Sequence, residues 1–318
     1  MGEATEQDRI PAWFTQALAT PGESRFVAVQ GCPIHYLRWG DPRRPGLLFV
    51  PASGAHAHWY DHLGPLFADQ FHVVAMDLAG CGDSGRRADY TIDQIKAEIM
   101  AVAADAGMFD AAVKPTLVGH SAGGQHVVRV AIDHDDRLLG VIAVEGLRYA
   151  ELAKDDAIKL FANGPRPAPK PAKVHPSREE AIARFRLMPA PRAPIDAEYL
   201  LDHIARHSVR EVEGGWTSKY DTRQVMPVTL AFELKDALKD LRCRSAAIYG
   251  EHTHIADETV SDAMAALNDG KVAVFVIPGA THYPPIDSPI AFLAAIKGVV
   301  TAWLAELARA RDAEPPPA

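Results

Sequence analysis

The residues best suited to chemistry form the segment Gly119-His120-Ser121-Ala122-Gly123. This G-x-S-x-G pattern follows an apolar run, PTLV, and opens a segment with helical spacing of apolar residues. A serine on so tight a strand-to-helix turn has strained backbone angles, and small neighbours avoid clashes. The helix start supplies a backbone N–H and a positive dipole end for a developing oxyanion. Ordinary glycine-rich turns share the bare pattern, but its place between strand and helix predicts that Ser121 is a nucleophile.

With this motif, the chain resembles the α/β-hydrolase family. Other segments agree with the resemblance: FVPASGAHAHW after the third predicted strand, MDLAGCGDSG after the fourth, and VIPGATHYPPIDSP near the end. The resemblance implies an α/β fold of the α/β-hydrolase type. Such a fold has a mostly parallel central sheet, helices on both faces and, in this chain, an inserted helical cap.

His282 is the histidine that the resemblance selects among 14 as the general base. It lies in a loop just after the last predicted strand, where this family places its catalytic histidine, and it follows the nucleophile in chain order. An imidazole has an unperturbed pKa of about 6.5, so it could take the Ser121 proton and return it to a leaving group. The alternative is a hydrogen-bonded surface histidine.

Relatives pair the serine and histidine with a third residue, an acid, and the position of this acid departs from the common pattern here. Many relatives carry their acid in a G-x-x-D motif after the strand at Ala246–Tyr249, but here that position is Thr253, which cannot carry a charge. Some relatives, including haloalkane dehalogenases and the zearalenone-type lactonases, place the acid at the strand end where Glu145 stands. We expect Glu145 to orient His282, with Glu251 and Asp257 as alternatives.

The family also implies an oxyanion hole and a pocket. Where relatives usually have His-Gly-x after the third strand, this chain has Pro-Ala-Ser-Gly, so Ser53 is expected to supply one backbone N–H and Ala122 the other. Aromatic residues in the cap are equally suited to packing inside it. The residues expected to line the substrate pocket are Gly54, Trp59, Trp216 and Tyr283.

The segment His56–His62 is rich in metal-binding side chains. The metallo-β-lactamase spacing H-x-H-x-D-H does not fit it, because one extra residue precedes Asp61. We therefore expect these histidines to pack or to line the pocket, and we expect neither a metal nor a cofactor.

The predicted elements alternate between strand and helix, which is typical of a parallel sheet. Between Leu147 and Leu241 there is no comparable strand run, and Gly164–Pro176 carries five prolines. We predict a first core part at 1–146, a helical cap at 147–241 and a second core part at 242–318. The predicted strands are Arg25–Val29, Ile34–Trp39, Gly46–Val50, His72–Met76, Thr116–Val118, Leu139–Val144, Ser245–Tyr249 and Val272–Ile277. The predicted helices are Ile92–Met108, Ala122–His134, Ser177–Phe185, Ala197–His207, Asp257–Leu267 and Pro289–Ala308.

Composition narrows the possible partners. The chain has 318 residues, of which 48% are apolar, and a net charge of −8, which disfavours binding to nucleic acid. Met1–Ile10 lacks the features of a secretory signal, and no apolar run was expected to reach the roughly 18 residues of a membrane span. Its three cysteines, Cys32, Cys81 and Cys243, form no metal or redox motif and are expected to be packed residues in a cytoplasmic protein.

Together these residues predict a serine hydrolase that cleaves a small carboxylic ester or lactone through an acyl-enzyme. Two alternatives remain. Cofactor-independent dioxygenases and carbon–carbon bond hydrolases use the same scaffold with similar serine and histidine residues. Some hormone receptors of this fold keep the triad and act as non-catalytic binding proteins.

Overall fold

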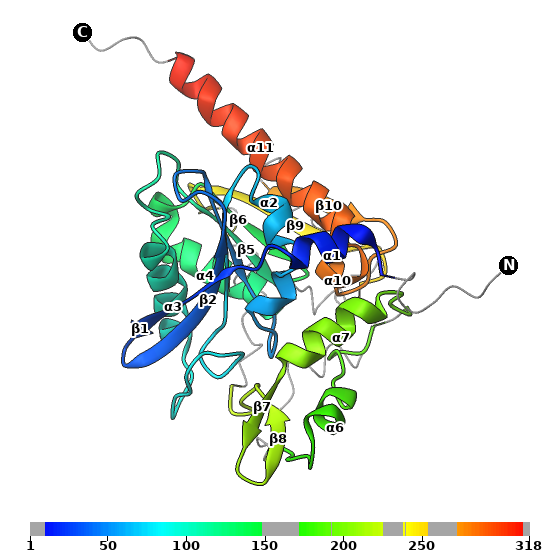
Figure 1. Cartoon of the computed structure of the whole chain (residues 1–318). Helices are drawn as coiled ribbons and strands as arrows, with labels where there is room; N and C mark the ends of the chain where they lie inside the picture. The colour runs from blue at the N-terminus through cyan, green and yellow to red at the C-terminus, as the bar shows by residue number, and fades with distance from the viewer. Residues whose placement is uncertain are drawn as a thin grey trace, which may run out of the picture.

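The computed structural model describes residues 10–147, 172–191, 193–224, 238, 240–253 and 272–313. Their centre is an eight-stranded sheet in the order β1-β2-β4-β3-β5-β6-β9-β10 (Figure 1). β2 pairs antiparallel with both β1 and β4, and the other neighbours pair in parallel, which confirms the predicted fold class. The strands are β1 (Glu23–Val29), β2 (Cys32–Trp39), β3 (Gly46–Val50), β4 (His72–Met76), β5 (Thr116–His120), β6 (Gly140–Val144), β9 (Arg244–Gly250) and β10 (Val272–Ile277).

The central strands are buried on both faces. Side chains alternate across a strand, so Leu47 and Phe49 of β3 join one core while Leu48 and Val50 join the other. A sheet covered on both faces requires near-continuous apolar strands, and GLLFV, HVVAM and GVIAV are buried throughout. This requirement explains why short apolar runs located these strands in the sequence.

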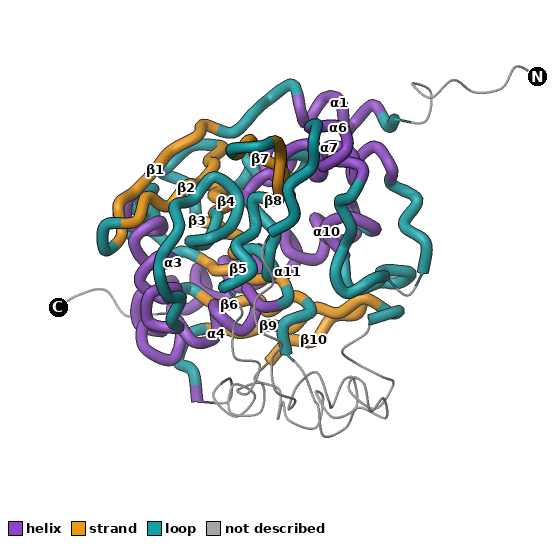
Figure 2. Tube along the Cα trace, turned by 90° about the horizontal axis from the view of Figure 1, so that it is seen from below, coloured by secondary structure: helices purple, strands orange, loops and turns teal. Residues whose placement is uncertain are grey.

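Helices cover both faces of the sheet (Figures 1 and 2). Thr91 begins α3 with a capping box, in which its side chain accepts a hydrogen bond from the Gln94 N–H. One face is covered by α3 (Ile92–Asp105) and α4 (Ala122–His134). The other is covered by α1 (Ala12–Leu18), α2 (Gly64–Phe67), α10 (Pro284–Asp287) and α11 (Pro289–Ala313). Two short 3₁₀ helices, η2 (Ala57–Tyr60) and η3 (Asp135–Arg137), complete this part of the chain.

The segment between β6 and β9 lies outside the large sheet. Its described part holds α6 (Arg178–Ala183), α7 (Glu198–His207) and a hairpin of β7 (Val209–Val212) with β8 (Gly215–Ser218), all below the sheet in Figure 1. The prediction of no strands here was wrong. The two strands are only four residues long and largely polar, so they carry little apolar signal, and Gly214, with φ 84°, permits the tight turn between them.

Hydrogen bonds join this segment to the loop that follows β4. The Asp221 N–H donates to the carbonyl of Gly80 at 2.7 Å, and the Gln224 side chain donates to that of Ala79 at 3.0 Å. The segment therefore lies against the carboxyl end of the parallel strands, where α/β enzymes place their sites. The predicted helix Asp257–Leu267 and most of the proline-rich stretch lie outside the described residues.

The three cysteines are free and buried. Burial raises the pKa of Cys81 to about 12 and that of Cys243 to about 11. Thiols with such high pKa values are poor nucleophiles near neutral pH, which agrees with their predicted role as packed side chains.

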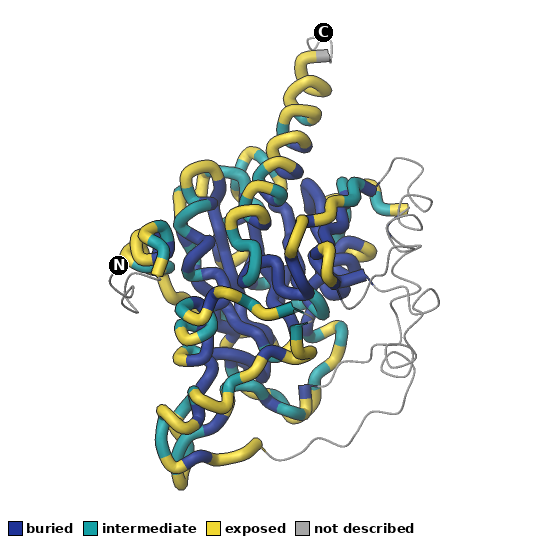
Figure 3. Tube along the Cα trace, turned by 90° about the vertical axis from the view of Figure 1, so that its right-hand side faces the viewer, coloured by how far each residue is buried: buried dark blue, intermediate teal, exposed yellow. Residues whose placement is uncertain are grey.

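Helix α11 contradicts the expectation that no apolar run reaches the length of a membrane span. An 18-residue window within Pro289–Asp312 has a mean hydropathy of 1.7, so this helix is long and apolar enough to cross a membrane by length and composition. Its first half, however, packs on the sheet, where Phe292, Ile296 and Trp303 are buried, while its last turns extend from the body and are exposed (Figure 3). The apolar face of α11 thus serves the core of the protein.

Replacing Gly140 with alanine tests the packing of α11 on the sheet. A Cβ there would lie 2.5 Å from the Trp303 ring and 2.6 Å from the Arg244 carbonyl, so we expect a loss of about 2 kcal/mol in unfolding free energy. Gly298→Ala is the control, because that exposed helical position has open space and should gain up to about 1 kcal/mol. Urea unfolding measures both; equal stability of the two variants would contradict the packing described.

Candidate active site

Ser121 lies on a strained turn between β5 and α4. Its φ of 52° and ψ of −116° are rare for a residue other than glycine, and its N–H donates to the carbonyl of Val144 at 2.8 Å. A Cβ at Gly119 would lie 2.1 Å from the carbonyl oxygen of Gly123, and a Cβ at Gly123 would lie 2.2 Å from that of Val50. Both glycines of the motif are therefore required by backbone contacts, as the sequence predicted.

His282 joins this serine from the loop after β10. Its Nε2 lies 3.0 Å from the Ser121 Oγ, within hydrogen-bond distance, and its backbone is held by His120. The His120 Nε2 lies 2.8 Å from the His282 carbonyl, and burial lowers the pKa of His120 to about 4. A neutral His120 with its proton on Nε2 donates to that carbonyl and so positions the residue beside the serine.

Glu145 follows β6 and completes the hydrogen-bonded chain. Its Oε2 lies 2.9 Å from the His282 Nδ1, and its own backbone has a φ of 52°, a second strained position. Its carboxylate also accepts the Gly250 N–H at 2.6 Å and the Thr253 hydroxyl. Thr253, which stands where many relatives carry their acid, therefore donates a hydrogen bond to Glu145.

The two alternative acids do not take this place in the described structure. Glu251 is exposed, and its carboxylate accepts the Gly279 N–H at 2.8 Å. Asp257 lies outside the described residues. Among the residues that the structure describes, Glu145 is the carboxylate in contact with His282.

The fold and the order of these residues agree with a family match. A family model described as the alpha/beta hydrolase family matches residues 47–296. The chain belongs to this family. The match covers the strands from β3 to β10 and includes the segment between β6 and β9.

Individual proteins resemble parts or most of the chain in sequence. It is 32% identical over 169 residues to the dihydrolipoyllysine-residue acetyltransferase component of the acetoin cleaving system of Cupriavidus necator, and the alignment covers 51% of this chain. The chain spans less than half of that relative, 44% of its length. It is 23% identical over 265 residues to 2-(acetamidomethylene)succinate hydrolase of Mesorhizobium japonicum, with 81% of this chain and 88% of the relative covered.

Solved structures agree in fold. A thioesterase domain from the curacin biosynthetic pathway superposes with a TM-score of 0.68 at 20% identity, covering 86% of this chain and 99% of that one. The crystal structure of E-2-(acetamidomethylene)succinate hydrolase gives the same TM-score at 19% identity, covering 88% and 99%. Likeness at this identity concerns the hydrolase fold alone.

The loop after β3 carries the expected oxyanion donor of this hydrolase. Ser53 is exposed at the tip of a turn closed by a 3.0 Å hydrogen bond from the Ala55 N–H to the Ala52 carbonyl, and Gly54 has a φ of 75°. Within the described part of the chain, neither the Ser53 N–H nor the Ala122 N–H donates to a protein acceptor. Both donors are therefore available to a ligand.

Two of the predicted pocket residues lie near His282 and His120. The ring centroid of Tyr283 is 5.2 Å from that of His282, and Trp59 packs 6.3 Å from both Tyr283 and His120. The Tyr283 hydroxyl donates to the carbonyl of Pro189 at 2.5 Å, which ties the histidine loop to the segment between β6 and β9. The buried Trp59 Nε1 has no hydrogen-bond partner among the described residues.

Trp216 lies elsewhere. Its described contacts are with Arg178, whose guanidinium lies 5.7 Å from its ring centroid, and with the backbone of His175, so it packs within its own segment. The residue that reaches the loop after β3 is Tyr220, because a Cβ at Gly54 would lie 3.5 Å from its ring. Tyr220 and Trp216 both lie in the segment GWTSKY. Trp216 is on β8, whereas Tyr220 follows this strand and lies next to the loop after β3.

Thr253→Val tests the support of Glu145. Valine keeps the shape of threonine but removes the hydroxyl donor from a buried carboxylate, so we expect a loss of about 1–3 kcal/mol in unfolding free energy. Thr253→Ser keeps a hydroxyl and should lose less. Urea denaturation measures the difference, and a valine variant as stable as the serine variant would show that the hydroxyl does not support Glu145.

Proposed function

We propose that the protein is a serine hydrolase that cleaves a small carboxylic ester or lactone. The observation that supports this most is the continuous chain of contacts from the Ser121 Oγ to the His282 Nε2, at 3.0 Å, and from the His282 Nδ1 to Glu145, at 2.9 Å. A histidine bonded at both nitrogens in this way can accept the serine proton while the carboxylate stabilises the resulting imidazolium.

The proposed reaction proceeds through an acyl-enzyme. Ser121 Oγ attacks the carbonyl carbon as its proton passes to His282 Nε2, and the carbonyl oxygen becomes an oxyanion held by the Ser53 and Ala122 N–H groups. The C–O bond of the ester then breaks, and the alcohol leaves with the proton from His282. Water attacks the acyl carbon, gives a proton to His282 and releases the acid, and Ser121 recovers its proton.

The surroundings support a small organic substrate. Tyr283 lies beside His282 and Trp59 packs next to Tyr283, so the surroundings of the histidine are aromatic. The net charge of −8 gives no general attraction for a polyanion. The names of the similar proteins, a thioesterase domain and a hydrolase, agree with bond cleavage by water, while the choice of an ester or lactone rests on the proposed triad.

Covalent labelling tests the nucleophile. A fluorophosphonate should modify the wild-type protein once, at Ser121, and peptide mass spectrometry should locate the adduct. Ser121→Ala should not be labelled and should lose hydrolysis of short p-nitrophenyl esters by at least about a thousandfold. Ser53→Ala keeps its backbone N–H and is the matched control, which should retain labelling. Failure of both labelling and ester hydrolysis in the wild type would contradict the proposal and favour a binding protein.

Moving the acid tests the role of Glu145. Glu145→Gln should lower kcat about a thousandfold, because a neutral amide cannot stabilise the imidazolium. Adding Thr253→Asp to that variant places a carboxylate beside the position that Glu145 held, since the Thr253 hydroxyl contacts the Glu145 carboxylate. The double variant should recover at least about tenfold in kcat.

The control for that experiment is Glu145→Gln with Thr253→Asn, which has the shape of the restored acid without its charge. It should stay as slow as Glu145→Gln alone. Near-normal turnover of Glu145→Gln would remove Glu145 from the mechanism, and equal rates for the aspartate and asparagine variants would show that a carboxylate at position 253 does not replace it. Oxygen consumption with an aromatic substrate would instead favour a dioxygenase.

A further inference from the structure

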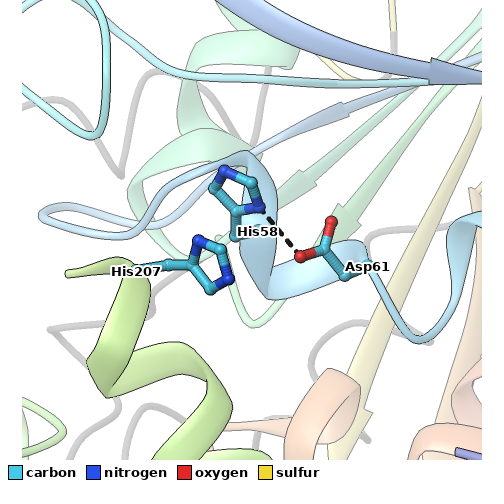
Figure 4. A group of neighbouring side chains, drawn as sticks. All are labelled: His58, Asp61 and His207. Atoms are coloured by element: carbon cyan, nitrogen blue, oxygen red, sulfur yellow. Dashed lines mark hydrogen bonds and ion pairs between the residues drawn. The ribbon is translucent and has the colours of Figure 1, made fainter. Parts of the chain in front are cut away.

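Four metal-binding side chains gather where α7 meets the segment after β3. His58 lies on η2, Asp61 follows that helix directly, and His203 and His207 come from α7. Figure 4 shows His58, Asp61 and His207 converging, with the two imidazoles side by side. The segment His56–His62 was not expected to bind metal, because its own spacing lacks a ligand set. The additional imidazoles come from a helix about 140 positions later, 142 for the pair Asp61 and His203.

The four side chains are already in contact. Asp61 Oδ2 lies 2.8 Å from the His58 Nδ1 and 2.9 Å from the His203 Nε2. The rings of His58 and His207 stack with centroids 3.9 Å apart, and those of His203 and His207 lie 4.8 Å apart. One ligand atom from each of His58, Asp61 and His207 lies within 4.8 Å of the others.

Three of the four side chains already hold ligand atoms near one another, and His203 contacts the same Asp61 oxygen as His58 does. Zinc bonds of about 2.0–2.1 Å to nitrogen and oxygen keep ligand atoms about 3.4 Å apart. The present contacts of 2.8 and 2.9 Å would lengthen slightly, and the His207 ring would move closer to the other ligands. His203 and His207 are four residues apart and so share one face of α7, an arrangement that many helical zinc sites use.

Access and charge also fit a cation. The side chains of His58, Asp61 and His203 are 14–18% exposed, so an ion can enter from solvent. A second carboxylate, Asp83, lies 3.8 Å from the His58 Nε2 and adds negative charge beside the cluster, although Lys219 pairs with it at 2.6 Å. Three imidazoles with one carboxylate are a donor set that selects zinc and similar transition metals over magnesium or calcium.

A neighbouring group of His35, Asp77 and Asp83 is less suitable. Asp77 uses both oxygens to accept backbone N–H groups, that of Ala57 at 2.6 Å and that of Asp83 at 2.7 Å. Because these hydrogen bonds fix the start of η2 and the loop after β4, Asp77 is committed to holding the backbone.

We propose that His58, Asp61, His203 and His207 form a Zn²⁺ site that fastens α7 to the core. Such an ion would link the segment following the Ser53 loop to the helix that covers it. The site would stabilise the covering segment over the candidate active site and would take no part in bond cleavage. The proposal does not depend on hydrolytic activity, and its test needs no substrate.

Titration of the chelator-treated full chain with Zn²⁺ alone tests this site. Calorimetry should show one ion per chain, and a zinc concentration about 100 times Kd should raise Tm by about 5 °C. Co²⁺ in place of Zn²⁺ should give the intense visible absorption of four-coordinate cobalt. This spectrum is measured on the wild-type protein and so does not depend on a variant that folds.

The variants assign the ligands. His203→Ala with His207→Ala should lose the binding and the rise in Tm, and Asp61→Asn should weaken binding at least about tenfold. His134→Ala, on α4 away from the cluster, should bind as the wild type does. Absence of binding by the wild type, a weak six-coordinate cobalt spectrum, or unchanged binding after the double substitution would each overturn the proposal.

Discussion

A carboxylate removed from water is stable only when donors surround it, and Glu145 is almost fully buried, at 1% exposure. Among the described residues, three groups donate to it: the Gly250 N–H, the Thr253 hydroxyl and the ring of His282. They come from the end of β9, the loop after it and the loop after β10. The position of this one charge therefore depends on two segments that are more than 100 residues from Glu145 in the sequence, and it orients the imidazole that faces Ser121.

The sheet makes this arrangement possible. β6 lies between β5 and β9, so the ends of these three parallel strands place Ser121, Glu145 and Gly250 at one edge. The Glu145 N–H donates to the Ile248 carbonyl, which adds one hydrogen bond to the pairing of β6 with β9. The left-handed backbone of Glu145 then turns the chain away from the sheet. Both residues with this strain near the site, Ser121 and Glu145, sit where a strand ends and a side chain must project above the sheet.

The sequence predicted the sheet because double-sided burial demands continuous apolar runs, however short, and it predicted the serine and histidine because their loops follow strands. It also pointed to Glu145, since Thr253 left the usual acid position without a charge. It missed the β7–β8 hairpin, whose four-residue strands carry no clear period, and it selected Trp216 for its large apolar surface, whereas Tyr220 is the residue that reaches the loop after β3. The histidine cluster was missed for a related reason: its ligands come together only through the packing of α7 on η2.

We expect an ionised Glu145 to hold the His282 Nδ1 proton in a buried hydrogen bond. Proton NMR of the ¹⁵N-histidine-labelled protein in water observes this proton directly. One exchange-protected imidazole resonance should appear far downfield of the amide region in the wild type and in Ser121→Ala. It should be absent in Glu145→Gln and in His282→Asn. A wild-type spectrum without that resonance, or a resonance that persists in Glu145→Gln, would contradict it.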